Sequence, residues 1–314
     1  MVLVVALGAV ARDSGPARPV PAPAISASDA GSSTGARGSS APQATPRADQ
    51  HLGPEPRPDV RRVVTLAPSL TELVLALGAG ERLVAVTRFD DDPRVADLPR
   101  VGGYNDPEPE AVLRVAPDLV LAQPAPENRG PVEALARLGV PIDAFQLGTL
   151  AQIDRALRAV GARLGLSAKA DALSAQLAAH RREVRARAPA KGVRALLVFG
   201  VEPLVVAGRG GFPGELLEET GAVNAIDSLL PYVRLSAEAA VASRPQRIVL
   251  CGVESPGSRP LLPGLSGVPT TVLSGTAMLH PGPRLSEALD QLATLLAIAP
   301  ARAQSGPALD GGAP

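Results

Sequence analysis

Three consecutive acidic residues, Asp90, Asp91 and Asp92, form the densest group of side chains in this sequence that could bind a cation. Consecutive residues of a loop rarely direct three carboxylates at one ion, so we interpret the run as a solvated acidic loop. The three histidines lie far apart in the sequence, and there is a single cysteine. A local histidine cluster, a multi-cysteine metal site and an intramolecular disulfide are therefore not expected.

Sequence motifs for catalysis and nucleotide binding are also missing. No G-x-G-x-x-G follows a strand pattern, and the P-loop pattern G-x-x-x-x-G-K-[ST] does not occur. The glycine-rich stretch 208–214 precedes a helix pattern, but its spacing fits neither motif. No G-x-S-x-G follows a strand pattern as a nucleophile elbow does, and no histidine is placed to serve Ser69 or Ser274 as a base. We therefore predict a protein that is not an enzyme and has no catalytic residues, no resident cofactor and no metal.

The composition limits the class of partner. The chain has 314 residues, with 31 Lys and Arg against 31 Asp and Glu. Nucleic-acid binding needs a basic stripe that neutralises phosphates, and none is found, so nucleic acid is not expected as a partner. Only 2% of the residues are aromatic and tryptophan is absent, so aliphatic side chains must fill the core. A chain of this length can form one large domain or two ordinary ones.

The first sixty residues are typical of an exported protein. Residues 1–11 are apolar and end in Ala9-Val10-Ala11, as in a secretory signal, although the usual basic start is missing. This stretch is too short to span a bilayer. Residues 12–60 are rich in Pro, Ala, Ser and Gly and indicate a disordered linker, in which His51 has no assigned role. We expect a protein of the periplasm or the cell surface.

From residue 61, short strand patterns alternate with helix patterns, which is typical of parallel βαβ units. Ser69 and Glu72 fit a capping box at the start of a helix that Gly78 ends. We expect a first lobe at 61–148. Its predicted strands are 62–67, 83–87, 118–122 and 141–147, and its predicted later helices are 109–116 and 131–138.

Two helices are predicted at 149–190. The first has apolar residues at three- and four-residue spacing from Leu150 to Leu164. The second, 167–188, contains no Gly or Pro, and its length of about 33 Å is enough to pass from one domain to another. A second α/β lobe is expected at 191–299 and a disordered tail at 300–314. The predicted strands of this lobe are 193–199, 204–207, 247–251 and 270–273, and its predicted helices are 213–220, 237–242 and 285–297.

Several phrases of the sequence together resemble one family. The stretch RVVTLAPSLTE at 62–72, followed by LGAG at 77–80, resembles the opening of class III periplasmic solute-binding proteins. These are the binding subunits of ABC importers for cobalamin, ferric siderophores and heme. The resemblance implies two Rossmann-like α/β lobes joined by a single long rigid helix, with the ligand between them. Further similar phrases are LPRVGG at 98–103, APDLVLA at 116–122 and LLEETGAVN at 216–224.

Two loops resemble those of the cobalamin-binding branch of this family. At 86–93, VTRFDDDP is similar to a loop in which an aromatic residue at the Phe89 position faces the corrin ring. The turn around Tyr104 is similar to the place where that branch has another aromatic residue. Flat macrocycles are held by apolar and aromatic faces with a few orienting polar groups. The resemblance implies capture of cobalamin or a related corrinoid by Pro68, Ser69, Phe89, Tyr104, Phe199, Phe212 and Arg284.

The resemblance also implies one acidic residue on each lobe, Glu110 and Glu238, that docks on arginines of the importer permease. Exposed acids on both lobes would engage a two-fold symmetric permease at two points. Each glutamate also lies in the first turn of a predicted helix, where the helix dipole favours a carboxylate, so a purely structural role is the other interpretation. We expect the binding protein itself to be a monomer.

Other interpretations stay open. The cobalamin branch usually has tryptophan in its pocket, and the family often places an aromatic residue where Gln123 stands here. Heme-binding relatives use a tyrosine near the Tyr104 position, so Tyr104 and His280 are candidate heme-iron ligands, and a ferric siderophore is another candidate ligand. The alternative of a different class is a metallocofactor-handling enzyme such as a chelatase, for which His280 with Glu202 is the candidate pair.

Overall fold

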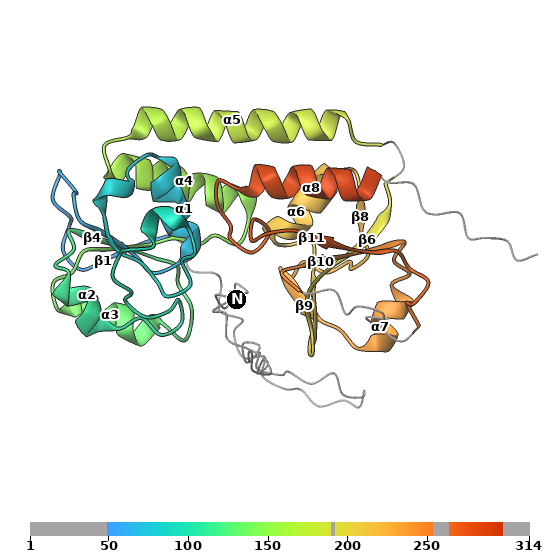
Figure 1. Ribbon diagram of the computed structural model, residues 1–314, viewed down its shortest axis with the longest axis horizontal. Coiled ribbons are helices and arrows are strands. Elements are labelled where there is room, and N and C mark those ends of the chain that lie inside the picture. The colour runs from blue at the N-terminus through green and yellow to red at the C-terminus, as the bar shows by residue number, and fades with distance from the viewer. Residues whose placement is uncertain (1–48, 190–191, 254–263, 298–314) are drawn as a thin grey trace, which may run out of the picture.

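The computed structural model describes residues 49–189, 192–253 and 264–297. The expected signal-like segment, most of the expected linker and the expected tail lie outside the described residues. The described chain folds into two α/β lobes that lie side by side, with a long helix running across the top of both (Figure 1). The predicted fold class, two α/β lobes, is confirmed.

The first lobe is built on a five-stranded sheet with the order β1-β5-β4-β2-β3. β2 pairs in parallel with β3 and β4, and β4 pairs in parallel with β5, so the carboxyl ends of these four strands lie at one edge. These are the four strands that the sequence predicted, each shorter than expected. The strands are β1 (Gln50–Leu52), β2 (Val63–Thr65), β3 (Leu83–Ala85), β4 (Leu119–Ala122) and β5 (Ile142–Ala144).

Helix α1 (Pro68–Ala76) follows β2 after two residues and buries Leu70, Leu73 and Val74 in the core. Gly78 lies beyond its C-terminus with a φ of +67°, a conformation that glycine adopts without strain. The helix and its glycine stop therefore agree with the prediction. The other helices of this lobe are α2 (Pro109–Arg114) and α3 (Arg129–Arg137), with short 3-10 turns η1 (Gly80–Arg82) and η2 (Pro93–Val95).

The predicted capping box of α1 is wrong. The N-cap residue of α1 is an alanine, whose side chain makes no capping hydrogen bond. The first helical residue is a proline, which has no backbone N–H that would need an acceptor. Ser69 and Glu72 have the spacing of a capping box but are both buried within the helix. A capping box occurs instead at α4 (Leu150–Arg163), where Thr149 and Gln152 bond to each other's backbone N–H groups.

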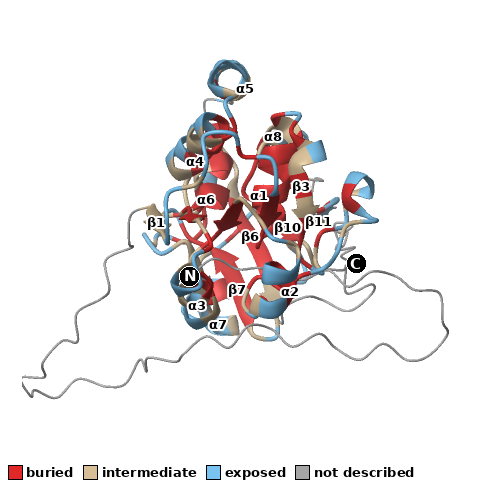
Figure 2. Ribbon diagram, turned by 90° about the vertical axis from the view of Figure 1, so that its left-hand side faces the viewer, coloured by how far each residue is buried: buried red, intermediate tan, exposed pale blue. Residues whose placement is uncertain are grey.

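Helix α5 (Ser167–Ala186) is the long helix at the top of Figure 1. Its 20 residues extend about 30 Å. It packs against α4 of the first lobe and α8 (Leu285–Ala297) of the second. Its buried residues are Ala170, Ser174 and Val184, and the rest of its surface is largely exposed (Figure 2). His180 of this helix pairs with Asp290 of α8 at 2.9 Å between Nε2 and Oδ1.

The second lobe contains a mixed six-stranded sheet with the order β11-β10-β6-β7-β9 and β8 beside β6. β8 and β10 pair in parallel with β6, and β11 pairs in parallel with β10, whereas β7 pairs antiparallel with both β6 and β9, so this lobe does not repeat the first. The sequence did not predict β8 and β9, because two- and three-residue strands show too little alternation. The strands are β6 (Arg194–Val201), β7 (Leu204–Ala207), β8 (Val223–Asn224), β9 (Tyr232–Arg234), β10 (Arg247–Cys251) and β11 (Thr270–Leu273).

The helices of the second lobe are close to prediction. α6 (Phe212–Glu219) begins one residue earlier than expected, and α7 (Ala237–Ala242) and α8 have the predicted bounds. α8 matches because its leucines recur at helical spacing and face the core. Cys251 is fully buried at the end of β10, as expected of a core residue.

One apolar core continues from the first lobe into the second. Its buried side chains include Leu73 and Leu157 of the first lobe and Phe212, Leu217 and Leu289 of the second. Each sheet has a smaller apolar cluster on its other face. The cluster of the first lobe lies under α2 and α3, and that of the second lobe lies under α7. The two lobes are therefore packed together beneath α5.

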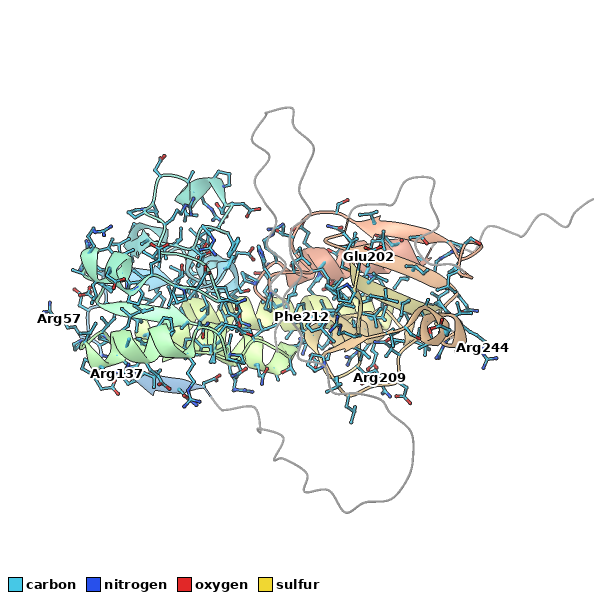
Figure 3. The ribbon with its side chains drawn as sticks, turned by 90° about the horizontal axis from the view of Figure 1, so that it is seen from below. Arg57, Arg137, Glu202, Arg209, Phe212 and Arg244 are labelled. Atoms are coloured by element: carbon cyan, nitrogen blue, oxygen red, sulfur yellow. The ribbon has the colours of Figure 1, made fainter. Side chains whose placement is uncertain are left out.

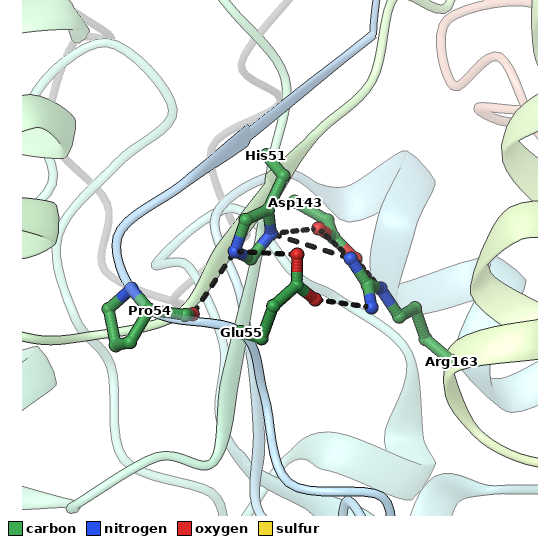
Figure 4. Close-up of polar contacts among 5 residues, drawn as sticks. All are labelled: His51, Pro54, Glu55, Asp143 and Arg163. Carbon is green, nitrogen blue, oxygen red and sulfur yellow. Dashed lines mark hydrogen bonds and ion pairs between the residues drawn. The ribbon is translucent and has the colours of Figure 1, made fainter.

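The end of the expected linker is ordered, contrary to the prediction. It forms β1, which pairs antiparallel with β5. His51, which had no assigned role, contacts Asp143 (Nδ1 to Oδ1, 2.7 Å) and the carbonyl oxygen of Pro54 (3.1 Å). Arg163 donates to the second oxygen of Asp143 at 2.6 Å (Figure 4). Local composition could not reveal this order, because Asp143 lies 92 residues from His51 in the sequence.

Asp143→Asn should lower the free energy of unfolding by about 1–3 kcal/mol, because the amide deprives His51 or Arg163 of a charged acceptor in a nearly buried place. Urea unfolding followed by circular dichroism measures the change. Asp59→Asn is the matched control, since Asp59 is exposed and its surface ion pair with Arg61 contributes little. Equal stabilities for the two variants would contradict the role given to this cluster.

Candidate functional site

The lobes meet where the N-termini of two helices face each other. The N–H of Phe212, the first residue of α6, donates to the carbonyl oxygen of Gly148 at 2.8 Å. The N–H of Leu150, the first residue of α4, donates to the Glu215 carboxylate of α6 at 2.7 Å. First-turn N–H groups have no partner within their own helix, and here the first N–H of each helix finds its acceptor in the other lobe. Phe212 itself is buried at this boundary (Figure 3).

Loops at the carboxyl edge of the first sheet carry three of the predicted ligand residues. Pro68 and Ser69 follow β2, and Phe89 follows β3. Parallel strands bring such loops to the same edge, where open α/β sheets bind ligands. Pro68 and Ser69 are buried in the first turn of α1. A methyl group at Gly282 of the second lobe would lie 3.5 Å from the Ser69 carbonyl oxygen, so this turn adjoins the other lobe.

The acidic run after β3 is not a solvated loop throughout, contrary to the prediction. Asp90 is buried and accepts hydrogen bonds from the Thr87 N–H (2.8 Å) and hydroxyl (2.6 Å). Burial raises the pKa of Asp90, and hydrogen bonds from Thr71 and Thr87 oppose that rise. Asp92 caps η2 and pairs with Arg94. No three His, Cys, Asp or Glu side chains of the described segments gather as a metal site requires.

Phe89 lies half-buried at the tip of this loop. The guanidinium carbon of Arg88 lies 4.8 Å from the centre of the Phe89 ring, a cation–π contact. Asp106 holds the same guanidinium through both carboxylate oxygens at 2.7 Å. A Cβ atom at Gly103 would lie 2.7 Å from the ring edge and would displace it. Arg88, Asp106 and Gly103 thus set where the Phe89 ring lies.

Tyr104 is enclosed in the first lobe, with 2% of its surface exposed. Its hydroxyl donates weakly to the carbonyl oxygen of Pro124 at 3.4 Å. The Asn128 amide donates to the carbonyl oxygens of Tyr104 and Gln123, both at 2.9 Å, and so fixes the turn. Burial, assisted by the negative charge of Glu127, raises the pKa of the Tyr104 hydroxyl. Its ring presents almost no face to solvent.

In the second lobe, Phe199 of β6 forms an edge-to-face pair with Tyr232 of β9. Their ring centres lie 5.2 Å apart with an interplanar angle of 83°. Phe199 is buried and Tyr232 is half-buried, so Tyr232 holds the exposed part of the pair. The sequence interpretation missed Tyr232 because its strand was not predicted. The sequence did offer one signal for Tyr232: the chain has only two Tyr and four Phe, so each aromatic residue was a candidate for the site.

Arg284 lies at the lobe boundary beside Glu72 of α1. The Glu72 Oε1 atom is 2.9 Å from His280 Nδ1 and 3.5 Å from Arg284 Nη1. Partial burial acts to lower the pKa of Arg284, but the charges of Glu72, Glu287 and Asp91 outweigh it and raise that pKa. Asp91 belongs to the loop of Phe89, so the charge of that loop acts on Arg284 across the boundary between the lobes.

The pair proposed for an enzyme is not formed. His280 is hydrogen-bonded to Glu72 rather than to Glu202. Glu202 is exposed at the turn between β6 and β7 (Figure 3). The geometry therefore gives no support to a His280–Glu202 metal-handling site.

Glu110 and Glu238 are both exposed in the first turns of short helices. Their helices, α2 and α7, lie at the bottom of the two lobes, on the side of the molecule opposite α5 (Figure 1). Hydrogen bonding with Ser236 lowers the pKa of Glu238, which favours its ionised form. Glu110 and Glu238 are thus exposed residues of two helices that lie on the same side of the molecule.

A cavity of about 510 Å³ lies on the other side, beneath α5, with walls from α4, α5, α6 and α8. None of the predicted ligand residues lines it. The charged groups around it satisfy one another, since Arg181 pairs with Glu219, and Arg158 and Ser174 pair with Asp154. The cavity is therefore distinct from the candidate site between the loops.

Comparison with known proteins assigns the family. The model of the family described as periplasmic binding protein matches residues 63–264, which is more than half of the chain. The chain belongs to this family. The resemblance to class III solute-binding proteins inferred from the sequence is thereby confirmed.

Similar proteins include some that are named for binding vitamin B12 and one that is named for binding heme. A vitamin B12-binding protein of Yersinia pestis (strain Pestoides F) is 31% identical over 251 residues, covering 78% of this chain and 89% of that protein. The periplasmic vitamin B12 binding protein BtuF of Vibrio cholerae is 26% identical with a TM-score of 0.65, over 76% of this chain and 96% of that one. The heme-binding protein RhuT from Roseiflexus sp. RS-1 is also 26% identical, with a TM-score of 0.68, over 76% and 98%.

These family members are binding proteins, in agreement with the prediction of a protein that is not an enzyme. Periplasmic relatives also agree with the expected location outside the cytoplasm. Among the described helices, none is both long enough and apolar enough to cross a membrane.

Both tyrosines should remain protonated in the folded protein at pH values where free tyrosine ionises, at about 10. Burial raises the pKa of Tyr104 and Tyr232 above that of the unfolded chain. The folded state then binds more protons than the unfolded state above pH ~10, so the free energy of unfolding should fall as the pH rises. Because the chain has no tryptophan, the absorbance of the tyrosinate band during a pH titration measures the ionisation of the tyrosines directly.

The chain has two tyrosines, so in the variant Tyr232→Phe the ionisation that remains in the pH titration belongs to Tyr104. A Tyr104 transition near the ordinary tyrosine value in the folded variant would contradict the enclosed position of its hydroxyl.

Proposed function

We propose that this family member captures cobalamin or a related corrinoid outside the cytoplasm and delivers it to the permease of an ABC importer. The similarity to the Yersinia protein, over 89% of that protein's length, carries this proposal, because that relative is named for vitamin B12 binding. The sequence resemblance of the Phe89 loop to the cobalamin branch agrees with it.

The residues of the two lobes suit a flat macrocycle with a polar rim. The half-buried Phe89 ring supplies an aromatic face from the first lobe, and Tyr232, backed by Phe199, supplies one from the second. Arg284 has five N–H donors and is 39% exposed, so it can orient acceptor groups at the ligand edge. Tyr104 and Phe212, being buried, support the walls of the site rather than face a ligand.

Heme is the second candidate ligand. The likeness to the Roseiflexus heme-binding protein favours it. Iron ligation by Tyr104 would need a deprotonated phenol, whereas burial raises the pKa of that hydroxyl. His280 would have to ligate through Nε2, because Nδ1 is engaged by Glu72. For these two reasons we favour the corrinoid over heme as the ligand. A ferric siderophore is a third candidate, and the titration described next can test it as well.

Calorimetric titration with cyanocobalamin should show one site per chain. Phe89→Ala should weaken the affinity about tenfold, since stacking on one aromatic ring contributes ~1–1.5 kcal/mol. Leu138→Ala is the control, because Leu138 is an exposed apolar residue at the end of α3. No heat with cobalamin or cobinamide, together with a Soret shift on adding hemin, would replace the corrinoid by heme.

The double variant Glu110→Ala with Glu238→Ala should keep its ligand affinity and lose importer-dependent uptake by about tenfold or more, because the charge-assisted contacts with the permease are removed. Uptake of labelled ligand into cells that carry the matching importer measures this. Glu81→Ala with Glu183→Ala removes two other exposed acids as the control. Undiminished uptake in the Glu110 and Glu238 variant would sink the docking assignment.

A further inference from the structure

Glu72 belongs to the first lobe but has its polar contacts in the second. It is the fifth residue of α1, and 9% of its side chain is exposed. Its Oε1 atom faces His280 Nδ1 at 2.9 Å and Arg284 Nη1 at 3.5 Å. Both partners belong to segment 276–284, which leads from the end of β11 into α8 and is here termed the rim segment. This carboxylate therefore joins the rim segment to the opposite lobe.

The second oxygen of Glu72 is unused. Oε2 is buried and has no hydrogen-bond partner among the described residues. It lies beneath Gly282 of the rim segment, where a methyl group would be 3.4 Å from it. A buried carboxylate that only held the lobes together would be expected to satisfy both oxygens, because each unpaired acceptor costs free energy. The spare acceptor points to a task beyond cohesion.

Arg284 is held from both lobes at once. Its Nη1 donates to Thr276 Oγ1 at 3.1 Å and its Nε to Glu287 Oε2 at 3.2 Å, both within the second lobe. Glu72 is its anionic partner from the first lobe. The guanidinium has five N–H groups in a planar fork, so donors remain free for a ligand after these contacts. Its orientation thus depends on the relative position of the two lobes.

We propose that Glu72 is a positioning residue of the binding site, which holds the rim segment and orients Arg284 toward the ligand. This inference rests on the proposed function, because it assigns Arg284 a ligand to meet. The free Oε2 lets Glu72 take a second N–H of Arg284, which turns the 3.5 Å contact into a bidentate pair. In this way the first lobe sets the direction of a ligand-binding group that the second lobe carries.

The test in the presence of ligand is a double-mutant cycle with Glu72→Gln and Arg284→Ala, titrated with cyanocobalamin. Glu72→Gln keeps the size of the side chain and an acceptor for His280 but removes the charge that orients Arg284. We expect it to weaken affinity about fivefold in the natural background and less than about twofold in the Arg284→Ala background. Equal losses in both backgrounds would overturn the proposal, because Glu72 would then act independently of Arg284.

Glu81→Gln is the matched control for this cycle. It neutralises another glutamate of the first lobe, one that is exposed and forms an ion pair with the neighbouring Arg82. Its affinity should equal that of the natural protein. A fivefold loss in this control would also overturn the proposal, since the effect would then be one of general charge.

A measurement without ligand separates this proposal from the proposed function. The ¹⁵N relaxation of the Arg284 Nε–H group, assigned with Arg284→Lys, reports how firmly the guanidinium is held. We expect an ordered group in the natural protein and in Glu81→Gln, and a mobile one in Glu72→Gln. An unchanged signal in Glu72→Gln refutes the positioning role whatever the protein binds. Loss of order in that variant, with no binding of any titrated ligand by the natural protein, would contradict only the proposed function.

Discussion

The shared apolar core at the lobe junction is the constraint on which the rest of the structure depends. Leu73 of the first lobe and Phe212 of the second belong to one buried cluster, so separating the lobes would expose a large apolar surface. The same movement would break the hydrogen bonds that the first N–H groups of α4 and α6 donate across the junction. The loops on the opposite side therefore face each other at a fixed spacing, which suits a binding protein whose site is assembled from two lobes.

Polar contacts refine what the apolar core fixes coarsely. Burial alone would leave the rim segment free to slide over α1, since apolar contact is not directional. The Glu72 carboxylate adds direction by engaging His280 and Arg284. On the first lobe, Asp90 closes the loop that carries Phe89 through two bonds from Thr87. With so few aromatic residues in the chain, the position of each exposed ring matters more than the number of rings.

Much of the fold could be predicted from sequence because its patterns are local. α7 and α8 have the predicted bounds, and the parallel strands of the first lobe were found from short apolar runs between helix patterns. Sequence patterns gave wrong predictions where the conformation of a residue depends on a partner far away in the sequence. Ser69 and Glu72 have capping-box spacing, yet the hydrogen-bond partner of Glu72 is His280, 208 residues away. β1 could not be foreseen for the same reason, since a Pro- and Ser-rich composition says nothing about Asp143.

The sequence by itself determined the fold class and the family, because hydrophobic periodicity and loop phrases are properties of neighbouring residues. The tertiary structure alone decided which candidate side chains can meet a ligand. It encloses Tyr104 and Phe212 in the core, leaves Phe89 half-buried, adds Tyr232 and turns Glu72 from a helix cap into a contact between lobes. Exposure and pairing are set by packing between segments far apart in the chain, and no local pattern of residues records that packing.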